Sequence, residues 1–521
     1  MKNNINNLNQ LLDNAVSKFA NRPALIFGAR KITYQQLKVS ADNLATSLYR
    51  LGIRSKDKVA VWLPNCPEFV FSFFAITRLG AVVVPINTMF KREEARYLVS
   101  DSQAKILICS IDKVEDVENI LSRVDTLMNI ISLPAPSQSR LMLSFHSLVR
   151  NSKGNFKRCE VVENDLAEIV YTSGTTGKPK GACLSHKNLI SNIKDCSQVI
   201  KFSKADSVVC ILPLFHSFAS TVCMLLPIYN GGLVVIMRSV RPFKRVIRTI
   251  FRHRITIFVG VPSLYSILSA MKLTKLRWVL NVFINPIRLC ISGAAALPLK
   301  VAKDFEKNFK RPLLQGYGLT EASPVVSLNL LDRKLKPGSV GRVLPSVKVK
   351  IVGKDGLEVV LGEVGELLVK GPNVMSGYYN LIEDTKKALK EGWLYTGDLA
   401  KMDEAGCIYI IGRSKEMINV RGFNVYPREI EDLLYQYPKI KEAAVVGVSH
   451  RHRGEVPVAF VVTEGKIEQR EIINYLRSNL AAYKIPLKVF FKENLPKNAT
   501  GKILKRELGD EVRATFEGIK E

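Results

Sequence analysis

The sequence lacks the features by which several functional classes are recognised. Nine cysteines are scattered between Cys66 and Cys407 without a C-x-x-C pair, which argues against a disulfide framework or a zinc site and predicts reduced thiols in a cytoplasm. No helix-turn-helix, zinc-finger or RNP signature is present, so we do not expect nucleic acid as a partner. The N-terminus has no apolar core of signal-peptide length, so we expect a cytoplasmic rather than a secreted protein.

Acidic residues are also scarce. The 521 residues carry a formal net charge of +29, and no acidic residue lies between Asp206 and Asp304. Within this stretch the basic residues cluster at Arg238, Arg241, Lys244, Arg245, Arg248, Arg252 and Arg254. Such a surface suits an anionic membrane, to which the protein would bind peripherally, or a phosphorylated ligand. The simpler alternative is a solvated face in a generally basic chain.

One long segment lacks charge altogether. Residues 208–237 contain no Asp, Glu, Lys or Arg, but Pro213, Pro227 and the Asn230-Gly-Gly run divide the segment into pieces of strand or short-helix length. We therefore expect buried α/β core rather than a membrane span.

Apolar periodicity alternates between strand and helix along the chain, which predicts an α/β fold with parallel or mixed sheets covered by helices. The early part has helices near 8–15, 37–51 and 67–79, strands at 24–27, 58–63 and 81–86, and a second round at 93–110. Residues 111–160 are polar and less regular, and we expect a surface excursion there. Later strands are expected at 348–352, 365–370, 407–411, 443–448 and 459–463, with a helix at 472–480.

The most informative stretch is Tyr171 to Gly181, which reads Y-T-S-G-T-T-G-K-P-K-G. We expect it to join a strand ending at Val170 to a helix that begins before Leu189. Glycines allow close backbone approach to an anion, hydroxyls add donors and lysines add charge, so the loop suits a polyphosphate. It is not a G-x-x-x-x-G-K-[ST] loop, because Pro179 occupies the position of the second glycine. The alternative is a flexible surface loop with solvated lysines.

Further short segments follow in a fixed order. They are L-P-L-F-H-S-F at 212–218, L-C-I-S-G-A-A-A at 289–296, Q-G-Y-G-L-T-E-A-S-P at 315–324, W-L-Y-T-G-D-L at 393–399, G-R-S-K-E-M-I-N-V-R-G-F-N-V-Y-P-R-E-I-E at 412–431 and P-K-N-A-T-G-K-I-L-K-R at 496–506. With the loop at 171–181, they resemble the motifs of the adenylate-forming superfamily, which includes acyl-CoA synthetases, luciferases and peptide-synthetase adenylation domains. The resemblance extends from about Thr33 to Lys502.

The resemblance implies a role for each motif residue. ATP or AMP would be bound by Thr172, Ser173, Gly174, Thr175, Thr176, Gly177, Lys180, Gly293, Ala294, Ala295, Gly316, Tyr317, Gly318, Thr320, Asp398 and Arg413. The catalytic residues would be Lys502, Glu321 and His216, and Thr320 with Glu321 would meet Mg²⁺. The acyl pocket would involve His216, Val261 and Ser323.

The same resemblance implies the domain organisation. A large N-terminal AMP-binding domain of βαβ-type sheets with a β-rich subdomain would span residues 1–412, and a small, mobile α+β domain would span 413–521. Lys415 would be the hinge, and Gly422 would lie along the CoA tunnel.

The implied activity is ATP-dependent ligation of a carboxylic acid to a thiol, with ATP, Mg²⁺ and CoA required. The G-F-N-V-Y-P-R-E-I-E wording at 422–431 resembles bacterial fatty acyl ligases, so a medium- or long-chain fatty acid is the expected acid. An acyl-AMP ligase that loads a carrier protein and an aryl-acid ligase of the coumarate type remain alternatives. The chain ends soon after Lys502, so any carrier protein is expected to be separate.

Overall fold

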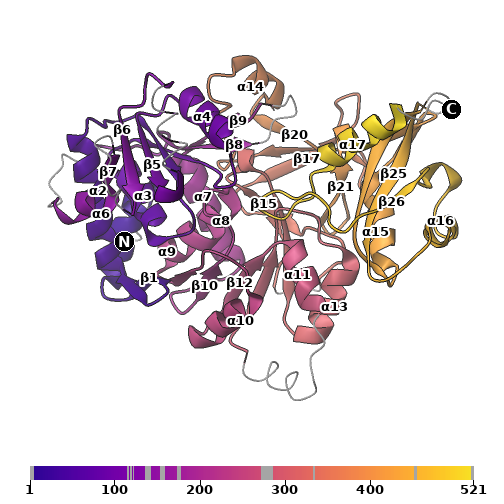
Figure 1. Cartoon of the computed structure of the whole chain (residues 1–521), viewed down its shortest axis with the longest axis horizontal. Helices are drawn as coiled ribbons and strands as arrows, with labels where there is room; N and C mark the ends of the chain where they lie inside the picture. The colour runs from indigo at the N-terminus through magenta and orange to yellow at the C-terminus, as the bar shows by residue number, and fades with distance from the viewer. Residues whose placement is uncertain are drawn as a thin grey trace.

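The computed structural model describes residues 5–113, 117, 120, 123–134, 142–152, 159–172, 178–270, 285–331, 335–450 and 454–517, with side chains described up to Arg513 in the last helix. Figure 1 shows two sheets of the N-terminal part on one side, a β-rich part above the middle, and a smaller C-terminal part on the other side. Within the described residues, no helix combines the length and apolarity that crossing a bilayer requires.

The first sheet has seven strands in the order β7-β6-β5-β3-β4-β8-β9. All neighbouring pairs are parallel except β8 with β9. The strands are β3 (Lys58–Trp62), β4 (Val82–Pro85), β5 (Ile106–Ser110), β6 (Asn129–Leu133), β7 (Met142–Ser144), β8 (Leu166–Thr172) and β9 (Lys180–Ser185). The predicted βαβ alternation is confirmed by the crossovers α3 (Pro67–Arg78) and α4 (Arg92–Asp101).

Two sequence expectations in this sheet are wrong. Residues 129–133 and 142–144 are sheet strands, and β6 is buried on both faces, so the region 111–160 is not wholly a surface excursion. The loop after Thr172 leads into β9, which pairs antiparallel with β8, and only then into α7 (His186–Val199). The short apolar run 182–184 was too brief to distinguish a strand from the start of a helix.

The second sheet has nine strands in the order β16-β15-β14-β13-β12-β10-β11-β1-β2, and its pairs from β14 to β1 are parallel. The strands are β1 (Pro23–Phe27), β2 (Arg30–Thr33), β10 (Ser207–Cys210), β11 (Leu233–Ile236), β12 (Ile257–Gly260), β13 (Leu289–Ser292), β14 (Leu313–Gly318), β15 (Val325–Leu328) and β16 (Arg342–Val343). The segment 208–237 is therefore buried core, as predicted, with α8 (Ser217–Ala219), the π-helix η2 (Ser220–Leu225) and α9 (Leu226–Asn230) between β10 and β11.

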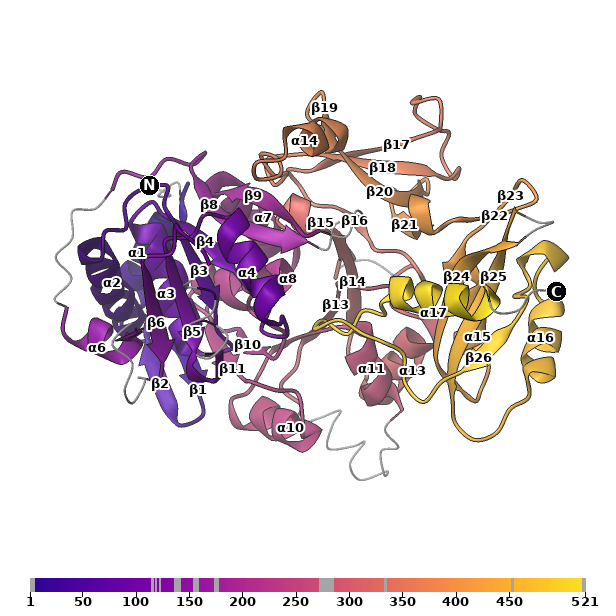
Figure 2. The same ribbon diagram turned by 45° about the horizontal axis from the view of Figure 1, so that its top comes forward.

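The helices divide into two groups around these sheets. The helices α1 (Leu8–Phe19), α2 (Tyr34–Arg50), α3, α7 and α9 share one apolar core with both sheets. Thr33 caps α2, because its side chain accepts from the Gln36 backbone and the Gln36 side chain accepts in return. The helices α10 (Phe243–Arg252), α11 (Pro262–Ser269) and α13 (Leu299–Phe309) lie on the side of the nine-stranded sheet remote from the seven-stranded one (Figure 2).

The β-rich part is a five-stranded sheet, as the sequence pattern predicts. It contains β17 (Lys348–Val352), β18 (Gly365–Lys370), β19 (Leu389–Lys390), β20 (Trp393–Met402) and β21 (Ile408–Arg413), with α14 (Ile382–Ala388) beside it. The next strand, β22 (Ile418–Val420), belongs to another sheet, so the predicted hinge lies where the chain passes between sheets through the short helix η4 (Ser414–Glu416).

The C-terminal part is built on its own sheet of β22, β23 (Phe423–Val425), β24 (Ile440–His450), β25 (Gly454–Thr463) and β26 (Val489–Phe491). One apolar cluster packs this sheet against α15 (Pro427–Gln436) and α16 (Gln469–Arg477), and a second packs it against α17 (Lys505–Glu517). Because both clusters are local, this part has a core of its own and does not depend on the large domain for it.

Candidate active site

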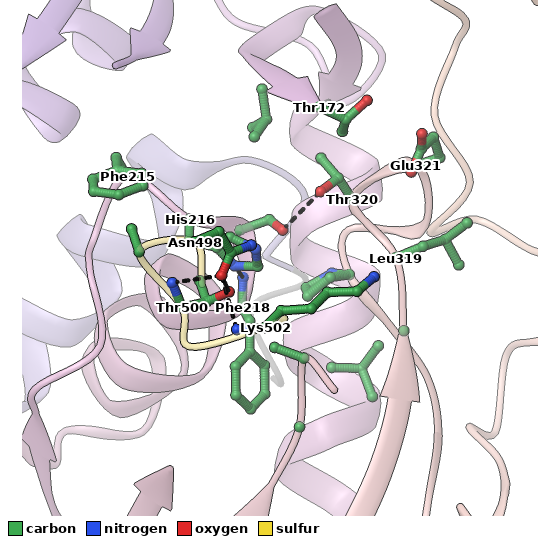
Figure 3. Close-up of a pocket in the computed structure, with 18 of the residues that line it drawn as sticks. Thr172, Phe215, His216, Phe218, Leu319, Thr320, Glu321, Asn498, Thr500 and Lys502 are labelled. Carbon is green, nitrogen blue, oxygen red and sulfur yellow. Dashed lines mark hydrogen bonds between the residues drawn. The ribbon is translucent and has the colours of Figure 1, made fainter. Parts of the chain in front are cut away.

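A cavity of about 820 Å³ lies where the three parts of the molecule meet. Its volume is near the upper end of the range for ligand pockets, so a nucleotide and a second molecule fit together. The predicted residues that line it are Thr172, Lys180, His216, Gly293, Ala294, Gly316, Tyr317, Gly318, Thr320, Glu321, Arg413, Lys415 and Lys502. Figure 3 shows His216, Asn498, Thr500 and Lys502 close together on one side, with Thr172, Thr320 and Glu321 beyond them.

One wall carries a chain of polar contacts between two sheets. The Tyr317 hydroxyl, on β14, donates to Asp398 Oδ2 on β20 at 2.6 Å, and Arg413 Nε on β21 lies 3.2 Å from Asp398 Oδ1. Burial and the Asp398 carboxylate raise the pKa of Tyr317 far above its usual value, so the hydroxyl stays a donor. Asp398 is itself buried and does not line the cavity, so it acts on the wall through Tyr317 and Arg413.

Glycine is required where this wall approaches α8. A Cβ added to Gly293 would lie 2.7 Å from the Phe218 ring, so a side chain there would displace the aromatic group. Gly293 follows directly from β13, and Ala294 after it has a φ of +67°. The small residues at 293–294 therefore keep the backbone open to the cavity, whereas Ala295 lies outside the lining.

The opposite polar corner links a carboxylate to a lysine through Tyr378. The Tyr378 hydroxyl donates to Glu321 Oε1 at 2.9 Å, and Lys180 Nζ lies 5.5 Å from the centre of the Tyr378 ring. Lys180 also forms an ion pair with Asp384 of α14. Tyr378 and Asp384 were missed by the sequence analysis, because the run at 377–384 matched no motif that was used there. Together they fix a cation and a carboxylate beside the same cavity.

The oxygen groups here fit a magnesium ion that is held mainly by a substrate. Glu321 and Thr320 face the cavity, and Thr320 Oγ1 lies 3.3 Å from Ser217 Oγ. Within the described residues, no group of three or more His, Cys, Asp or Glu side chains could enclose a metal ion. Mg²⁺ is commonly bound by one or two protein oxygens together with phosphates and water, so this donor set suits it.

His216 is held as a neutral imidazole. It caps α8, and its Nδ1 accepts a hydrogen bond from the Phe218 backbone at 3.2 Å, which leaves the proton on Nε2. Burial, together with the nearby charge of Lys502, lowers the pKa of His216 to about 4. The side chain therefore offers a hydrogen-bond donor without a positive charge.

Lys502 enters the cavity from the C-terminal part on the loop after β26. Burial lowers the pKa of this lysine from its ordinary value, and the Arg413 charge adds to the effect. The neighbouring Lys497, Asn498, Ala499, Thr500 and Leu504 also line the cavity. The sequence analysis singled out Lys502 but not these five neighbours, although they lie within the same motif.

Several predicted positions are elsewhere. Val261 and Ser323 are buried and do not line the cavity in this structure, so their assignment to the acyl pocket stays a prediction. Gly422 lies in the turn between β22 and β23, outside the cavity lining. Ser173, Gly174, Thr175, Thr176 and Gly177 lie outside the described residues.

Comparisons with known proteins agree with this geometry. The family profile for "AMP-binding enzyme" matches residues 12–379, and that for "AMP-binding enzyme C-terminal domain" matches residues 429–502. A long-chain-fatty-acid–CoA ligase from Bacillus subtilis strain 168 is 35% identical, over 97% of this chain and 94% of the relative. A 4-coumarate–CoA ligase from Solanum tuberosum is 34% identical, over 95% of this chain and 91% of the relative.

A solved structure also bears on the arrangement of the domains. ATP-bound MatB from Rhodopseudomonas palustris is 31% identical and superposes with a TM-score of 0.89, over 97% of this chain and 99% of MatB. The apo form of the same protein, at the same identity, gives 0.77 over 98% of this chain and 100% of MatB. The two MatB structures have the same sequence, so the difference between their TM-scores reflects a difference in conformation. The structure of this chain is nearer to the ATP-bound form. The chain therefore belongs to the AMP-binding enzymes of the adenylate-forming superfamily, and within it to the AMP-forming acyl-CoA synthetases.

Proposed function

We propose that this synthetase activates a fatty acid as acyl-AMP, with release of pyrophosphate, and then transfers the acyl group to CoA. The observation that carries the proposal is one cavity that combines three features. These are the Tyr317–Asp398–Arg413 wall, the Lys180–Glu321 corner and the Lys502 ammonium. ATP, Mg²⁺ and CoA are required by this class of enzyme.

In the first step a carboxylate oxygen of the acid attacks the α-phosphorus of ATP. The bond from that phosphorus to the bridging oxygen breaks, and pyrophosphate leaves with the electron pair. In our proposal Tyr317, with Gly293 and Ala294, holds the adenine, and Arg413 with Asp398 orients the ribose. Lys502 stabilises the negative charge that gathers at the α-phosphate in the transition state, because its ammonium enters a partly desolvated site.

The triphosphate is assigned to the loop after β8. Thr172 and Lys180 frame this loop at the cavity, and we propose that Ser173, Gly174, Thr175, Thr176 and Gly177 supply donors between them. Before ATP binds, Lys180 is paired with Asp384, and the phosphates would replace that carboxylate. Mg²⁺, held by Glu321 and Thr320 together with phosphate oxygens, would neutralise charge on the leaving pyrophosphate.

In the second step the CoA thiol attacks the acyl carbonyl of acyl-AMP. A carbon–sulfur bond forms, the carbon–oxygen bond to AMP breaks, and the thiol proton passes to solvent. We propose that the part of the chain after Lys415 turns about this residue between the steps, which withdraws Lys502 and brings the turn at Gly422 to the cavity. The separate cores of the two parts support this division.

The apolar part of the cavity supports a fatty acid. The helices α7, η2 and α9 pack together and line the cavity with Cys196, Ile200, Val222 and Leu226, and β15 adds Leu328. All five side chains are apolar, which suits an alkyl chain better than a hydroxylated ring. Sequence identity does not discriminate here, because the fatty-acid and coumarate ligases are equally similar to this chain within 1%.

The test is pyrophosphate release with ATP and Mg²⁺ across fatty, aryl and amino acids, with and without CoA. We expect turnover with a fatty acid that rises strongly on adding CoA, with acyl-CoA as the product. Slow adenylate formation at a rate that does not change when CoA is added would favour a carrier protein as the acceptor. Turnover with a coumarate-type acid and none with fatty acids would overturn the proposed substrate.

We further propose that the basic residues around α10 contact an anionic membrane surface. All seven predicted basic residues from Arg238 to Arg254 are exposed, while Val246 and Ile250 anchor the helix. Within the described part of the chain, no acidic side chain pairs with these seven. Phe251, on α10 itself, is 42% exposed, which adds an apolar group beside the basic residues.

Vesicle co-sedimentation tests this contact. Arg245→Ala/Arg248→Ala/Arg252→Ala should lose binding to vesicles that contain phosphatidylglycerol, and wild-type binding should fall as salt is raised. The matched control removes three exposed lysines at the opposite end of the molecule, Lys386, Lys387 and Lys390 (Figure 1). Unchanged vesicle binding by the arginine variant contradicts the proposal, and a raised KM for CoA would assign the cluster to the CoA phosphate instead.

A further inference from the structure

The loop that carries Lys502 is closed around one side chain. Asn498 Oδ1 accepts from the Lys502 backbone at 2.9 Å, from the Thr500 backbone at 3.0 Å and from Thr500 Oγ1 at 2.8 Å. The Asn498 backbone N–H in turn donates to the Lys502 carbonyl at 2.9 Å, and Lys497 and Ile503 form an antiparallel bridge outside it. The loop thus resembles a small hairpin with an amide oxygen at its centre (Figure 3).

The same loop is fitted closely to the large domain. Gly501 has a φ of +78°, and a Cβ added to it would lie 2.7 Å from Ser263 Oγ on α11. Thr500 is only 7% exposed, so its backbone and hydroxyl donors have little access to water if Asn498 does not accept from them. The backbone on each side of Lys502 is therefore set by contacts that leave little room for another loop conformation.

We propose that Asn498 is a positioning residue for the adenylation step, which sets the direction in which the Lys502 side chain enters the cavity. This inference rests on the proposed function. A lysine has a long and flexible side chain, so the position of its ammonium depends on where the backbone directs Cα–Cβ. Asn498 fixes that backbone directly, because its side-chain oxygen accepts a hydrogen bond from the Lys502 amide. Its contribution is confined to the first step, because in the proposed second step Lys502 has left the cavity.

The experiment separates the two half-reactions. In Asn498→Ala, formation of acyl-AMP should slow by about 30- to 100-fold in kcat, the loss expected when a reacting group is misplaced by about 1 Å. The KM values for ATP and the fatty acid should change little. Thioester formation from supplied acyl-AMP and CoA should stay within about twofold of wild type.

Two variants provide controls. Asn498→Asp retains an oxygen at the same place and should recover most of the adenylation rate. Asn479→Ala makes the same substitution at an exposed asparagine of the same domain, whose side chain donates to the Tyr475 carbonyl, and both half-reactions should be unchanged. Thermal unfolding of all variants shows whether Asn498→Ala remains folded.

The alternatives give different results. Equal loss in both half-reactions with a lower Tm would mean that Asn498 only stabilises the domain, and would overturn the inference. A higher KM for ATP at unchanged kcat would also overturn it, because Asn498 would then bind substrate. Wild-type rates in Asn498→Ala would overturn it outright. Absence of acyl-AMP formation by the wild-type enzyme would instead overturn the proposed function.

Discussion

The two walls of the cavity are built in different ways. On the large-domain side, Tyr317, Asp398 and Arg413 stand on β14, β20 and β21, and Asp398 contacts both of the others. On the C-terminal side, Lys502 stands on a short loop whose shape depends on Asn498 and Gly501. The first wall belongs to the large domain, whereas the second belongs to a part with apolar clusters of its own, which supports our proposal that the first wall stays in place while the second is exchanged.

This difference matches what each wall is needed for. The nucleotide is present in both proposed steps, and the residues that we propose for it lie on the wall of the large domain. In the same proposal the Lys502 ammonium is needed only while the α-phosphate is attacked, and it lies on the wall that would leave. The described contacts across the boundary include Gly501 against Ser263 and the Arg428 guanidinium donating to the Ile410 carbonyl. Such local contacts can break without disturbing either core.

The largest effect should come from removing the exchangeable cation. Lys502→Ala should lower acyl-AMP formation by about 10³-fold, because charge developing at the α-phosphate loses its ammonium in a partly desolvated site. Thioester formation from supplied acyl-AMP should be nearly normal. Both rates can be followed by rapid quench, with the exposed Lys466→Ala as the control in the same domain. Equal loss in both half-reactions would mean that the C-terminal wall is not exchanged.

The next effect concerns the hinge. Lys415→Pro should reduce thioester formation by about 10²-fold or more while acyl-AMP formation stays within a few-fold, because proline fixes φ near −65° and prevents the backbone from turning. Lys415→Ala is the control, because the Lys415 side chain also lines the cavity and its loss must be separated from the backbone effect. Two intact half-reactions in the proline variant would place the hinge elsewhere.

The large-domain wall should respond differently, with an effect on binding in both steps. Tyr317→Phe removes a hydroxyl that donates to buried Asp398, which should weaken ATP binding by about 10-fold, the lower end of the cost of losing a hydrogen bond to a charged group. The KM for ATP and the Kd for AMP should rise together. If only the KM for ATP rises, the Tyr317–Asp398 contact serves the first step alone, and the two walls are less different than we argue.

The sequence predicted the large-domain wall better than the C-terminal one. Tyr317, Asp398 and Arg413 belong to short motifs whose residue types suggest their chemistry, and Asp398 contacts the other two in the structure. Sequence reasoning did not find Asn498, because its work is done by one amide oxygen on local backbone groups, which no residue pattern distinguishes from an ordinary turn. It also missed Tyr378, which meets Glu321 only because residues 57 apart are folded together.

The fold divides along similar lines. Long segments with strong periodicity, such as α2 and α3, were predicted to within a few residues. The errors fall on short segments whose state is decided by tertiary partners. β9 is a strand because β8 pairs with it. β6 and β7 extend the same sheet, although no local pattern in residues 111–160 predicts these strands.

The smallest expected effect is in the pH dependence of the two half-reactions, and it separates the two walls most clearly. Burial and Arg413 lower the pKa of Lys502 from its ordinary value, so the ammonium loses its proton at a lower pH than a free lysine does. The rate of acyl-AMP formation should therefore fall at a lower alkaline pH than it would if Lys502 had the pKa of a free lysine. Lys502→Arg, although slower, should show no such fall, because arginine stays charged.

His216, on the large-domain side of the cavity, should add nothing to this profile between pH 5 and 8. His216 has a pKa of about 4, so it is neutral throughout that range and its charge does not change. Thioester formation from supplied acyl-AMP, in which Lys502 has left the cavity, should lack the alkaline fall seen for adenylation. The measurement is the rate of each half-reaction at saturating substrates across that range and up to the alkaline limit of protein stability. An identical alkaline fall in both half-reactions would assign it to a group that stays in place, and Lys502 would no longer explain it.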